Sequence, residues 1–191
     1  LQLCNSAYFG LGSPVSDLNE AVTQLGFGQI CRLVVAASSS RTLAQSQKGY
    51  GIDQGELWKH SVTAAVAAQI LARSKGDNDS VVFTGALLHD IGHYADEFSA
   101  YSPTDVIDKR HEISGAAILE GLVDPRVVGA VRLHVAAKRY LCAVEPDYFS
   151  RLSAASVHTL ELQGGPMTPD EVTEFESRDG ALDAVRIRRW D

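Results

Sequence analysis

The residues best suited to chemistry in this chain of 191 residues are His89 and Asp90, which stand side by side after the apolar run from Thr84 to Leu88. A neutral imidazole and an ionised carboxylate can bind one divalent cation together, or the carboxylate can bridge two cations while the imidazole binds one of them. His93 follows four residues after His89, so a continuing helix would turn all three side chains toward one cavity. This spacing predicts a metal site.

Three further histidines open or interrupt apolar helical segments, and Asp191 is the last residue of the sequence. The histidines are His60, His111 and His134. A single histidine on an apolar helix is more often a hydrogen-bonded core residue than a metal ligand. Several of them accompanying an adjacent His-Asp pair favour a metal site over a set of unrelated core residues.

The elements that must position these residues show helical periodicity along almost the whole chain. Helices are predicted after a cap at Ser16 and Asp17, from Ile30 to Ala37, at about 54–74, 79–92, 111–121, 125–142 and 145–153, and from a capped start at 168–171. The polar stretch 38–49 is predicted to be a linker. No convincing strand pair or repeat is present in the sequence, so the predicted fold class is all α.

Composition excludes several classes of function. A net charge of −7 disfavours nucleic acid as a partner. Two predicted helices meet at Gly26-Phe27-Gly28 as in a helix-turn-helix, but Arg32 is the only basic residue between positions 1 and 40, too few to follow phosphates. No apolar run approaches the roughly 20 residues of a membrane span, and no signal-peptide pattern is found.

The three cysteines indicate a compartment. Cys4, Cys31 and Cys142 lie in apolar segments without C-x-x-C spacing. They are predicted to be buried free thiols in a reducing cytoplasm.

Longer motifs carry a family resemblance. Four motifs are His-Asp-Ile-Gly-His at 89–93, Arg-Leu-His-Val-Ala-Ala-Lys-Arg-Tyr-Leu-Cys at 132–142, Leu-Ser-Ala-Ala-Ser-Val-His-Thr-Leu-Glu-Leu-Gln-Gly-Gly-Pro-Met at 152–167 and Arg-Ile-Arg-Arg-Trp-Asp at 186–191. They resemble the HD-domain mixed-valent di-iron oxygenases that cleave organophosphonates, typified by 2-amino-1-hydroxyethylphosphonate dioxygenase. The resemblance implies an HD-domain helical bundle, with residues 50–191 as a metal-binding catalytic core.

The first half of the chain resembles a different branch of the superfamily. Three motifs are similar to the HD-related output domain, HDOD, of bacterial signalling proteins. They are Asn-Ser-Ala-Tyr-Phe-Gly at 5–10, Ser-Pro-Val-Ser at 13–16 and Glu-Ala-Val-Thr-Gln-Leu-Gly at 20–26. This resemblance extends to about residue 90. It implies that residues 1–49 form an N-terminal helical segment of that kind.

The oxygenase resemblance implies a role for each matching residue. Six ligands, with Asp90 bridging an Fe(II)/Fe(III) pair, would be His60, His89, Asp90, His111, His134 and Asp191. A phosphonate pocket would come from His93, Lys138, Ser156 and Arg188. Tyr50 would shield the open iron position, and Asp53, where the oxygenases have a glutamate, would hold a substrate amine. His158 matches no ligand position and is predicted to be structural.

The implied function is O2-dependent cleavage of the C–P bond of a small 1-hydroxyalkylphosphonate, with release of phosphate and a carboxylate such as glycine. Lysine and arginine suit this partner, because they supply charge and hydrogen-bond donors to phosphonate oxygens. Two alternatives stay open at this point: a metal-dependent HD phosphohydrolase and a non-enzymatic signalling module. The resemblance specifies no oligomeric state.

Overall fold

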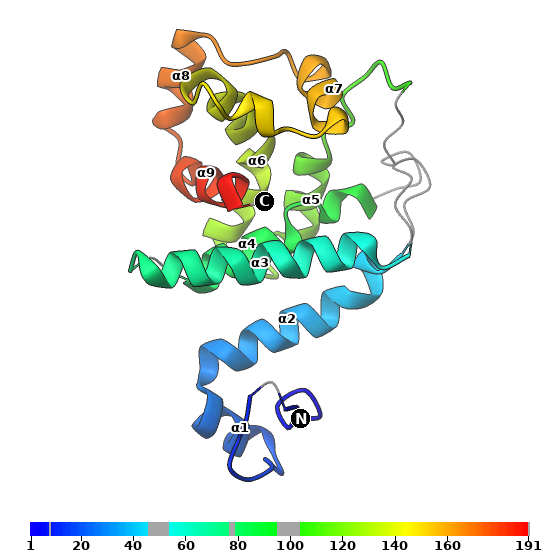
Figure 1. Ribbon diagram of the computed structural model, residues 1–191, viewed down its shortest axis with the longest axis vertical. Helices are drawn as coiled ribbons and strands as arrows, with labels where there is room; N and C mark the ends of the chain where they lie inside the picture. The colour runs from blue at the N-terminus through cyan, green and yellow to red at the C-terminus, as the bar shows by residue number, and fades with distance from the viewer. Residues whose placement is uncertain (8, 46–53, 77–78, 95–103, 191) are drawn as a thin grey trace. The chain divides into compact units, whose positions relative to one another are not determined.

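The computed structural model describes residues 1–7, 9–45, 54–76, 79–94 and 104–190. Every regular element within these residues is helical, which confirms the all-α prediction (Figure 1). The α-helices are α1 (Leu18–Leu25), α2 (Phe27–Leu43), α3 (Glu56–Ser74), α4 (Asp79–Leu88), α5 (His111–Leu119), α6 (Pro125–Val144), α7 (Ala154–Leu162), α8 (Pro169–Glu176) and α9 (Ala181–Trp190). Two short 3-10 helices are η1 (Ile91–Tyr94) and η2 (Phe149–Arg151).

The chain forms two compact units, Leu1–Arg41 and Thr42–Asp191. The predicted boundary at residue 49 lies outside the described residues. In the first unit, Cys4, Val15, Ala21 and Ile30 form a small core. The Asn5 side-chain amide joins two segments of this unit, because it donates to the carbonyl of Val15 and accepts the Val15 N–H.

Local signals explain how α1 and α2 begin and end. The Asp17 side chain accepts the N–H of Glu20 and caps α1, as predicted. Gly26, with φ of 82°, then ends α1 before α2 begins at Phe27. The prediction of a linker from residue 38 is wrong as far as Leu43, because α2 continues through this stretch. The Ser39 hydroxyl donates to the carbonyl of Val35, a bond that accommodates serine inside a helix.

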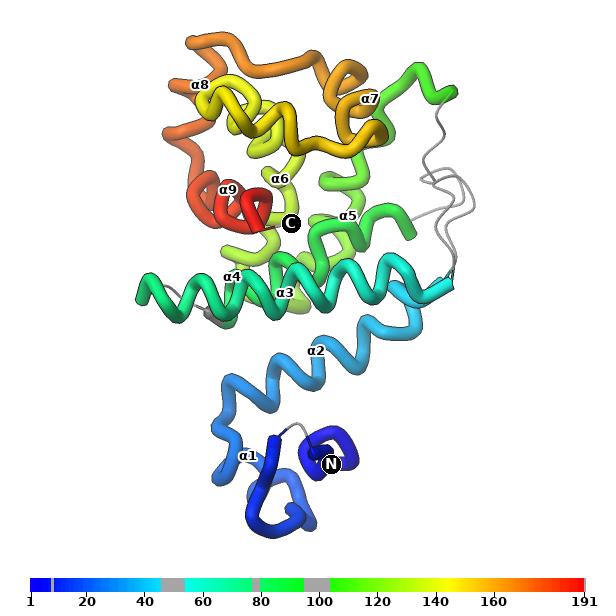
Figure 2. The backbone as a smooth tube through the Cα atoms, in the orientation of Figure 1, coloured from blue at the N-terminus to red at the C-terminus, as the bar shows by residue number. Residues whose placement is uncertain are grey.

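The second unit is built around α6, which packs against α4, α5, α8 and α9, while α3 packs along α4 (Figure 2). Buried residues of α6, α8 and α9, including Leu141, Phe175 and Ala184, form a core on one side of α6. At the start of α6, Arg126 makes a bidentate ion pair with the buried Asp183 of α9: its Nε donates to Oδ2 at 3.0 Å and its Nη2 donates to Oδ1 at 3.1 Å. This ion pair joins α9 to α6 across 57 residues of sequence.

Several predicted boundaries in this unit are wrong. The helix expected at 79–92 ends at Leu88, and η1 continues it after a turn at His89 and Asp90. The helix expected at 145–153 is reduced to η2. Helices α7 and α9 were not predicted, although Ser153 caps α7 by accepting the N–H of Ser156. The cysteine prediction holds for Cys4 but not for Cys31, which is exposed, or for Cys142, which is half-buried.

No single helix within the described ranges is long and apolar enough to cross a membrane. The sharply bent pair α1 and α2 reaches that length and composition only when the two helices are taken together.

Candidate metal centre and its pocket

Asp90 lies at the centre of a histidine cluster in the second unit. Its Oδ2 is 3.2 Å from Nε2 of His89, and its Oδ1 is 3.5 Å from Nε2 of His111 and 3.7 Å from Nε2 of His134. The Nε2 atom of His93 is 3.9 Å from the same Oδ1. The Nε2 atoms of His111 and His134 are 2.9 Å apart, so both rings point at the same space.

The donor atoms fall into two groups that share Asp90. One group is His60, His89 and Asp90, and the other is Asp90, His93 and His111; within each, the donor atoms lie within 4.8 Å of one another. Nitrogen and carboxylate donors of this kind suit iron, zinc or manganese. Two adjacent groups with one common carboxylate are the arrangement needed for a pair of cations bridged by Asp90.

The backbone fixes the orientation of two of these rings. Nδ1 of His89 is 2.9 Å from the carbonyl of Ala86, and Nδ1 of His134 is 2.7 Å from the carbonyl of Val131. A carbonyl only accepts, so each Nδ1 carries the proton and each Nε2 lone pair faces the cluster. This is the tautomer that a metal-binding histidine requires.

Close backbone contact brings η1 against α5. A Cβ atom at Gly92 would collide with the His111 carbonyl and would lie 2.7 Å from the backbone nitrogen of Gly115. The contact therefore requires glycine at position 92. It places the rings of His93 and His111 in a stack, with centroids 4.0 Å apart.

The residue before His111 is in an unusual conformation. Arg110 has φ of 50° and ψ of 44°, and it is the only non-glycine residue of the described chain with positive φ. A left-handed conformation costs a residue with a side chain about 1 to 3 kcal/mol, and such residues cluster at functional sites. Here it turns the chain from the loop into α5 so that the first residue of the helix, His111, faces Asp90.

The cluster shifts the pKa values of its members. Burial would raise the pKa of Asp90, but the interactions with the surrounding histidines, first with His89 and then with His111, outweigh burial and hold the pKa well below its ordinary value. Burial, with the neighbouring His111 and His89, holds the pKa of His134 well below its ordinary value. Asp90 is therefore anionic and His134 neutral at pH 7, the states in which both bind metals.

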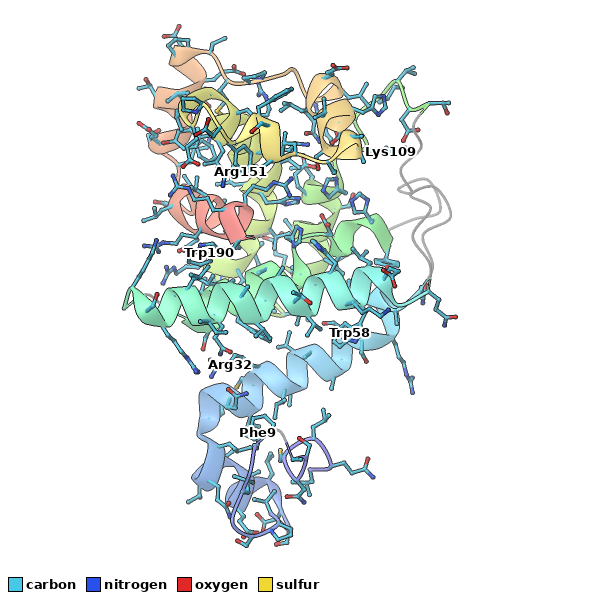
Figure 3. All side chains as sticks on the ribbon, in the orientation of Figure 1. Phe9, Arg32, Trp58, Lys109, Arg151 and Trp190 are labelled. Carbon is cyan, nitrogen blue, oxygen red and sulfur yellow. The ribbon has the colours of Figure 1, made fainter. Side chains whose placement is uncertain are left out.

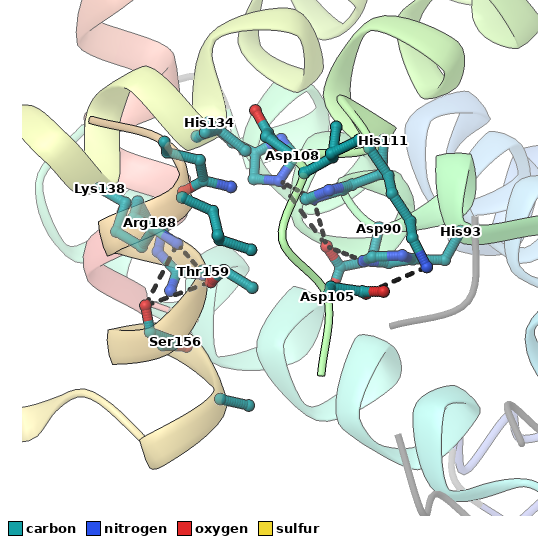
Figure 4. A pocket seen from close by; sticks show the side chains of 16 residues that line it. Asp90, His93, Asp105, Asp108, His111, His134, Lys138, Ser156, Thr159 and Arg188 are labelled. Carbon is teal, nitrogen blue, oxygen red and sulfur yellow. Dashed lines mark hydrogen bonds and ion pairs between the residues drawn. The ribbon is translucent and has the colours of Figure 1, made fainter. Parts of the chain in front are cut away.

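A cavity of about 120 Å³ opens beside this cluster (Figure 4). Asp90, His93, His111 and His134 line one part of it, and Lys138, Ser156, Thr159 and Arg188 line another. Residues of the loop before α5 complete the wall. In Figure 4 the side chains of Lys138, Arg188, Ser156 and Thr159 gather on one side, and Asp90 and His93 lie on the other.

Lys138 and Arg188 make one end of the cavity cationic, as an anion-binding site requires. The Lys138 ammonium is almost fully buried and donates to Oγ1 of Thr159 at 2.8 Å. Burial, followed by the charge of Arg188, lowers its pKa to about 8. Two cationic side chains held so close together lose part of their mutual repulsion when an anion binds between them.

The structure brings together most of the residues predicted for the site. His60, His89, Asp90, His111 and His134 meet in the cluster, and His93, Lys138, Ser156 and Arg188 line the cavity. The spacing placed His93 with His89 and Asp90, and the family resemblance assigned it to the phosphonate pocket; its Nε2 lies 3.9 Å from Oδ1 of Asp90, and it belongs to one of the two donor groups. The predicted positions Tyr50, Asp53 and Asp191 lie outside the described residues. His158 is not among the residues that line the cavity.

The residues at the cavity or cluster that sequence analysis missed include Asp105, Asp108, Glu112 and Thr159. Thr159 follows Ser156 at i+3 on α7 and could have been found from that spacing. Glu112 is buried beside His111, with its Oε2 3.9 Å from Nδ1 of that ring, and burial raises the pKa of its carboxyl. The two aspartates lie on a loop near Lys109 (Figure 3), where no periodicity marks them.

The chain is similar to known proteins of two kinds. The family model of the HDOD domain matches residues 1–113. A 1-hydroxy-2-(trimethylamino)ethylphosphonate dioxygenase (glycine-betaine-forming) of Leisingera caerulea is 47% identical over 121 residues, 63% of this chain and 61% of that protein. A hydroxymethylphosphonate dioxygenase of Gimesia maris is 42% identical over 145 residues, 73% of this chain and 71% of that protein.

A third relative, an uncharacterised protein of Acanthamoeba polyphaga mimivirus, is 32% identical over 126 residues and is covered over 57% of its length. The chain thus spans between about three fifths and about seven tenths of the length of these relatives.

Proposed function

The chain belongs to the HDOD family and to the family of HD-domain phosphonate dioxygenases, and from this premise we propose that it cleaves the C–P bond of a short 1-hydroxyalkylphosphonate with O2. The C1–H and C–P bonds break, and both oxygen atoms of O2 are incorporated into the products, which are inorganic phosphate and a carboxylate. From 2-amino-1-hydroxyethylphosphonate, the carboxylate is glycine. O2 is the oxidant, so no further co-reactant is needed.

The observation that supports this proposal most strongly is the single cavity that joins the Asp90 cluster to Lys138 and Arg188. A metal centre and a pair of cations at one small cavity suit a ligand that carries an anionic group beside a metal-binding hydroxyl. A 1-hydroxyalkylphosphonate has its hydroxyl on the carbon attached to phosphorus and fits both requirements.

We propose that the metal ligands are His60, His89, Asp90, His111, His134 and Asp191, with Asp90 shared by two irons. When bound, an Fe(II)/Fe(III) pair supplies O2 activation and a Lewis-acidic position for the substrate hydroxyl. Asp90 offers its two oxygens to the two donor groups that meet at it. His89 and His134 keep their Nδ1 protons on backbone carbonyls, so neither ring needs to lose a proton before its Nε2 binds.

Lys138 and Arg188 hold the phosphonate in this proposal, and Ser156 and Thr159 of α7 complete its binding site. Thr159 accepts from the Lys138 ammonium and so keeps it at the cavity wall. His93, stacked on His111, donates to a phosphonate oxygen from the metal side. These groups orient the C1–H bond toward the metal centre and exclude water from it.

The test is metal analysis of anaerobically purified protein followed by a phosphate-release assay with and without O2. The expected result is about two irons per chain and phosphate release from 2-amino-1-hydroxyethylphosphonate or hydroxymethylphosphonate only when O2 is present. Release of phosphate from a phosphate ester without O2 would overturn the proposal in favour of a phosphohydrolase. Stable protein with neither iron nor turnover would favour the signalling module.

A further inference from the structure

A buried carboxylate beside the metal donors has no task in the proposed function. Glu112 is the second residue of α5 and is 8% exposed. Its Oε2 atom is buried and has no hydrogen-bond partner within the described residues. Such an atom is costly to bury, because it gives up its bonds to water without replacing them. A carboxylate kept at this cost indicates a role that an apolar side chain could not fill.

The group that faces this oxygen is the ring of His111, whose Nδ1 is 3.9 Å from Oε2. Nδ1 of His89 and Nδ1 of His134 instead lie at hydrogen-bond distance from backbone carbonyls. In the described parts of the chain, no carbonyl accepts a hydrogen bond from Nδ1 of His111. A histidine that binds a metal generally donates its other ring N–H to a carbonyl or a carboxylate. The Glu112 carboxylate is the acceptor placed to serve this third ring.

The stack with His93 does not by itself fix the orientation of the His111 ring. Stacking holds the plane of the ring, but a half-turn about the Cβ–Cγ bond keeps that plane and exchanges Nδ1 with Cδ2 and Nε2 with Cε1. In the observed orientation Nε2 is 3.5 Å from Oδ1 of Asp90, and Nδ1 faces Glu112. After a half-turn, ring carbons would face both carboxylates. The two carboxylates together therefore favour the one orientation in which a nitrogen can bind metal beside Asp90.

The distance between Glu112 and His111 can close without a change in the helix. The separation of 3.9 Å is roughly 1 Å longer than an N–H···O hydrogen bond. The terminal torsion of a glutamate is soft, so rotation about it can bring Oε2 to Nδ1 while α5 stays in place. Burial raises the pKa of the Glu112 carboxyl and the charge of His111 lowers it, so the two groups already interact electrostatically.

We propose that Glu112 is a positioning residue for the metal centre, whose carboxylate accepts the Nδ1 proton of His111 and thereby presents Nε2 of that ring to the metal. This inference rests on the proposed function, because it takes His111 to be a ligand. The negative charge beside Nδ1–H also makes the opposite nitrogen a stronger donor. Glu112 itself contacts neither substrate nor metal in this role.

The test is the affinity for Fe(II), measured by anaerobic titration against a competing chelator. Glu112→Gln keeps the size of the side chain and an acceptor oxygen and removes the charge. We expect Fe(II) affinity to fall about tenfold in Glu112→Gln and up to about 100-fold in Glu112→Ala, as the loss of such a partner costs at other metal sites. The visible spectrum of the Co(II)-loaded protein should also change in Glu112→Gln, because it follows the donor strength of His111.

Chemical denaturation separates this role from packing. Glutamine removes a buried charge, so Glu112→Gln stripped of metal should be at least as stable as the stripped wild-type protein, and yet it should bind metal more weakly. Glu120→Gln is the matched control, because Glu120 is exposed at the other end of α5 and belongs to neither donor group. It should keep the Fe(II) affinity and the Co(II) spectrum of the wild-type protein.

The outcomes distinguish this inference from the proposed function. Unchanged Fe(II) affinity in Glu112→Gln would overturn the role of Glu112, while O2-dependent phosphate release by the wild-type protein upheld the proposed function. A loss confined to Glu112→Ala would overturn it as well, because packing alone would explain that result. Weaker Fe(II) binding by Glu112→Gln would support the role of Glu112 even if no phosphonate were cleaved, a result that would refute only the proposed function.

Discussion

At the scale of single residues, one carboxylate lies at the centre of the proposed metal site. Asp90 is the member common to both donor groups, and the nitrogens of four histidines lie within 3.9 Å of its oxygens. If a bridging carboxylate is lost, two cations face each other without shared negative charge and each lacks a ligand.

Asp90→Ala should therefore remove most of the iron, and His89→Ala should do the same. Elemental analysis after anaerobic reconstitution measures this directly. His158→Ala is the matched control, because His158 belongs to neither donor group, and it should keep wild-type iron content. Full iron occupancy in Asp90→Ala would refute the ligand assignment.

The anion-binding residues should be separable from the metal centre. Lys138→Ala and Arg188→Ala should retain iron and lose phosphonate affinity, each by roughly 1.5 to 3 kcal/mol, as expected for charge-assisted hydrogen bonds. Substrate titration followed by the iron spectrum is the measurement. Unchanged affinity in both variants would exclude the two side chains from the phosphonate site.

The lowered pKa of Lys138 gives phosphonate binding a pH dependence. The ammonium is charged below its pKa of about 8 and loses its proton as the pH rises through that value. Affinity for the phosphonate dianion should therefore decrease above about pH 8. In Lys138→Arg the guanidinium stays charged, so that decrease should disappear. An identical alkaline decrease in both proteins would assign it to another group.

Sequence alone was informative for the residues that are chemically conspicuous. Adjacent histidine and aspartate, and histidines in apolar helices, mark the cluster because such groups are costly to bury without a partner. The same reasoning could not find Asp108 or Glu112. An aspartate in a loop and a glutamate in a first helical turn are ordinary at those positions, and only the folded chain places them at the cavity and beside His111.

At the scale of elements, the contact between η1 and α5 determines whether the ligands meet. Gly92→Ala would force a methyl group into the backbone at His111 and Gly115. We expect a destabilisation of about 1 to 3 kcal/mol or more, as overpacking costs, together with weaker iron binding. Chemical denaturation and elemental analysis measure the two effects.

Gly129→Ala is the control for that experiment. Gly129 lies within α6, and a Cβ atom there would come no closer than 4.0 Å to its nearest neighbour, the Asp179 carbonyl. Alanine should be neutral or stabilising at this helical site by up to about 1 kcal/mol. Equal effects of the two substitutions would show that the backbone contact at Gly92 is not tight.

Helix boundaries were predictable where a cap is local and less so where a helix depends on packing. Asp17 caps the start of α1 with its side chain, and Gly26 ends the helix in a conformation with positive φ. The interruption of the helix at His89 was not visible, since Ile91-Gly92-His93 continues the apolar pattern and the break follows from the approach of α5. Helix α9 was missed because three arginines and an aspartate among its ten residues make the segment polar, and its buried face is defined by contact with α6.

At the scale of the whole second unit, the proposed metal donors come from α3, the turn after α4, η1, α5 and α6. A metal bound by all of them should stabilise the fold, because ligands that are dispersed in the unfolded chain bind metal weakly there. Removing iron with a chelator should lower Tm by about 5 to 10 °C, corresponding to about 2.7 kcal/mol at a metal concentration 100 times Kd. The chelator should leave Tm unchanged in Asp90→Ala, and an equal decrease there would mean that it acts elsewhere.

The ion pair between Arg126 and Asp183 extends this linkage to the C-terminal helix. Asp183 is 5% exposed, and its helix carries Arg188 to the cavity wall. If phosphonate binds more tightly when α9 is packed against α6, its binding must stabilise that packing by the same free energy, because the two equilibria are thermodynamically linked. Phosphonate should therefore slow amide hydrogen exchange in α9. Arg126→Ala leaves the buried Asp183 carboxylate with a weaker partner, so this variant should exchange faster in α9 and bind phosphonate less tightly. Helix α9 would then report whether substrate is bound, and amide exchange rates would detect this without any turnover.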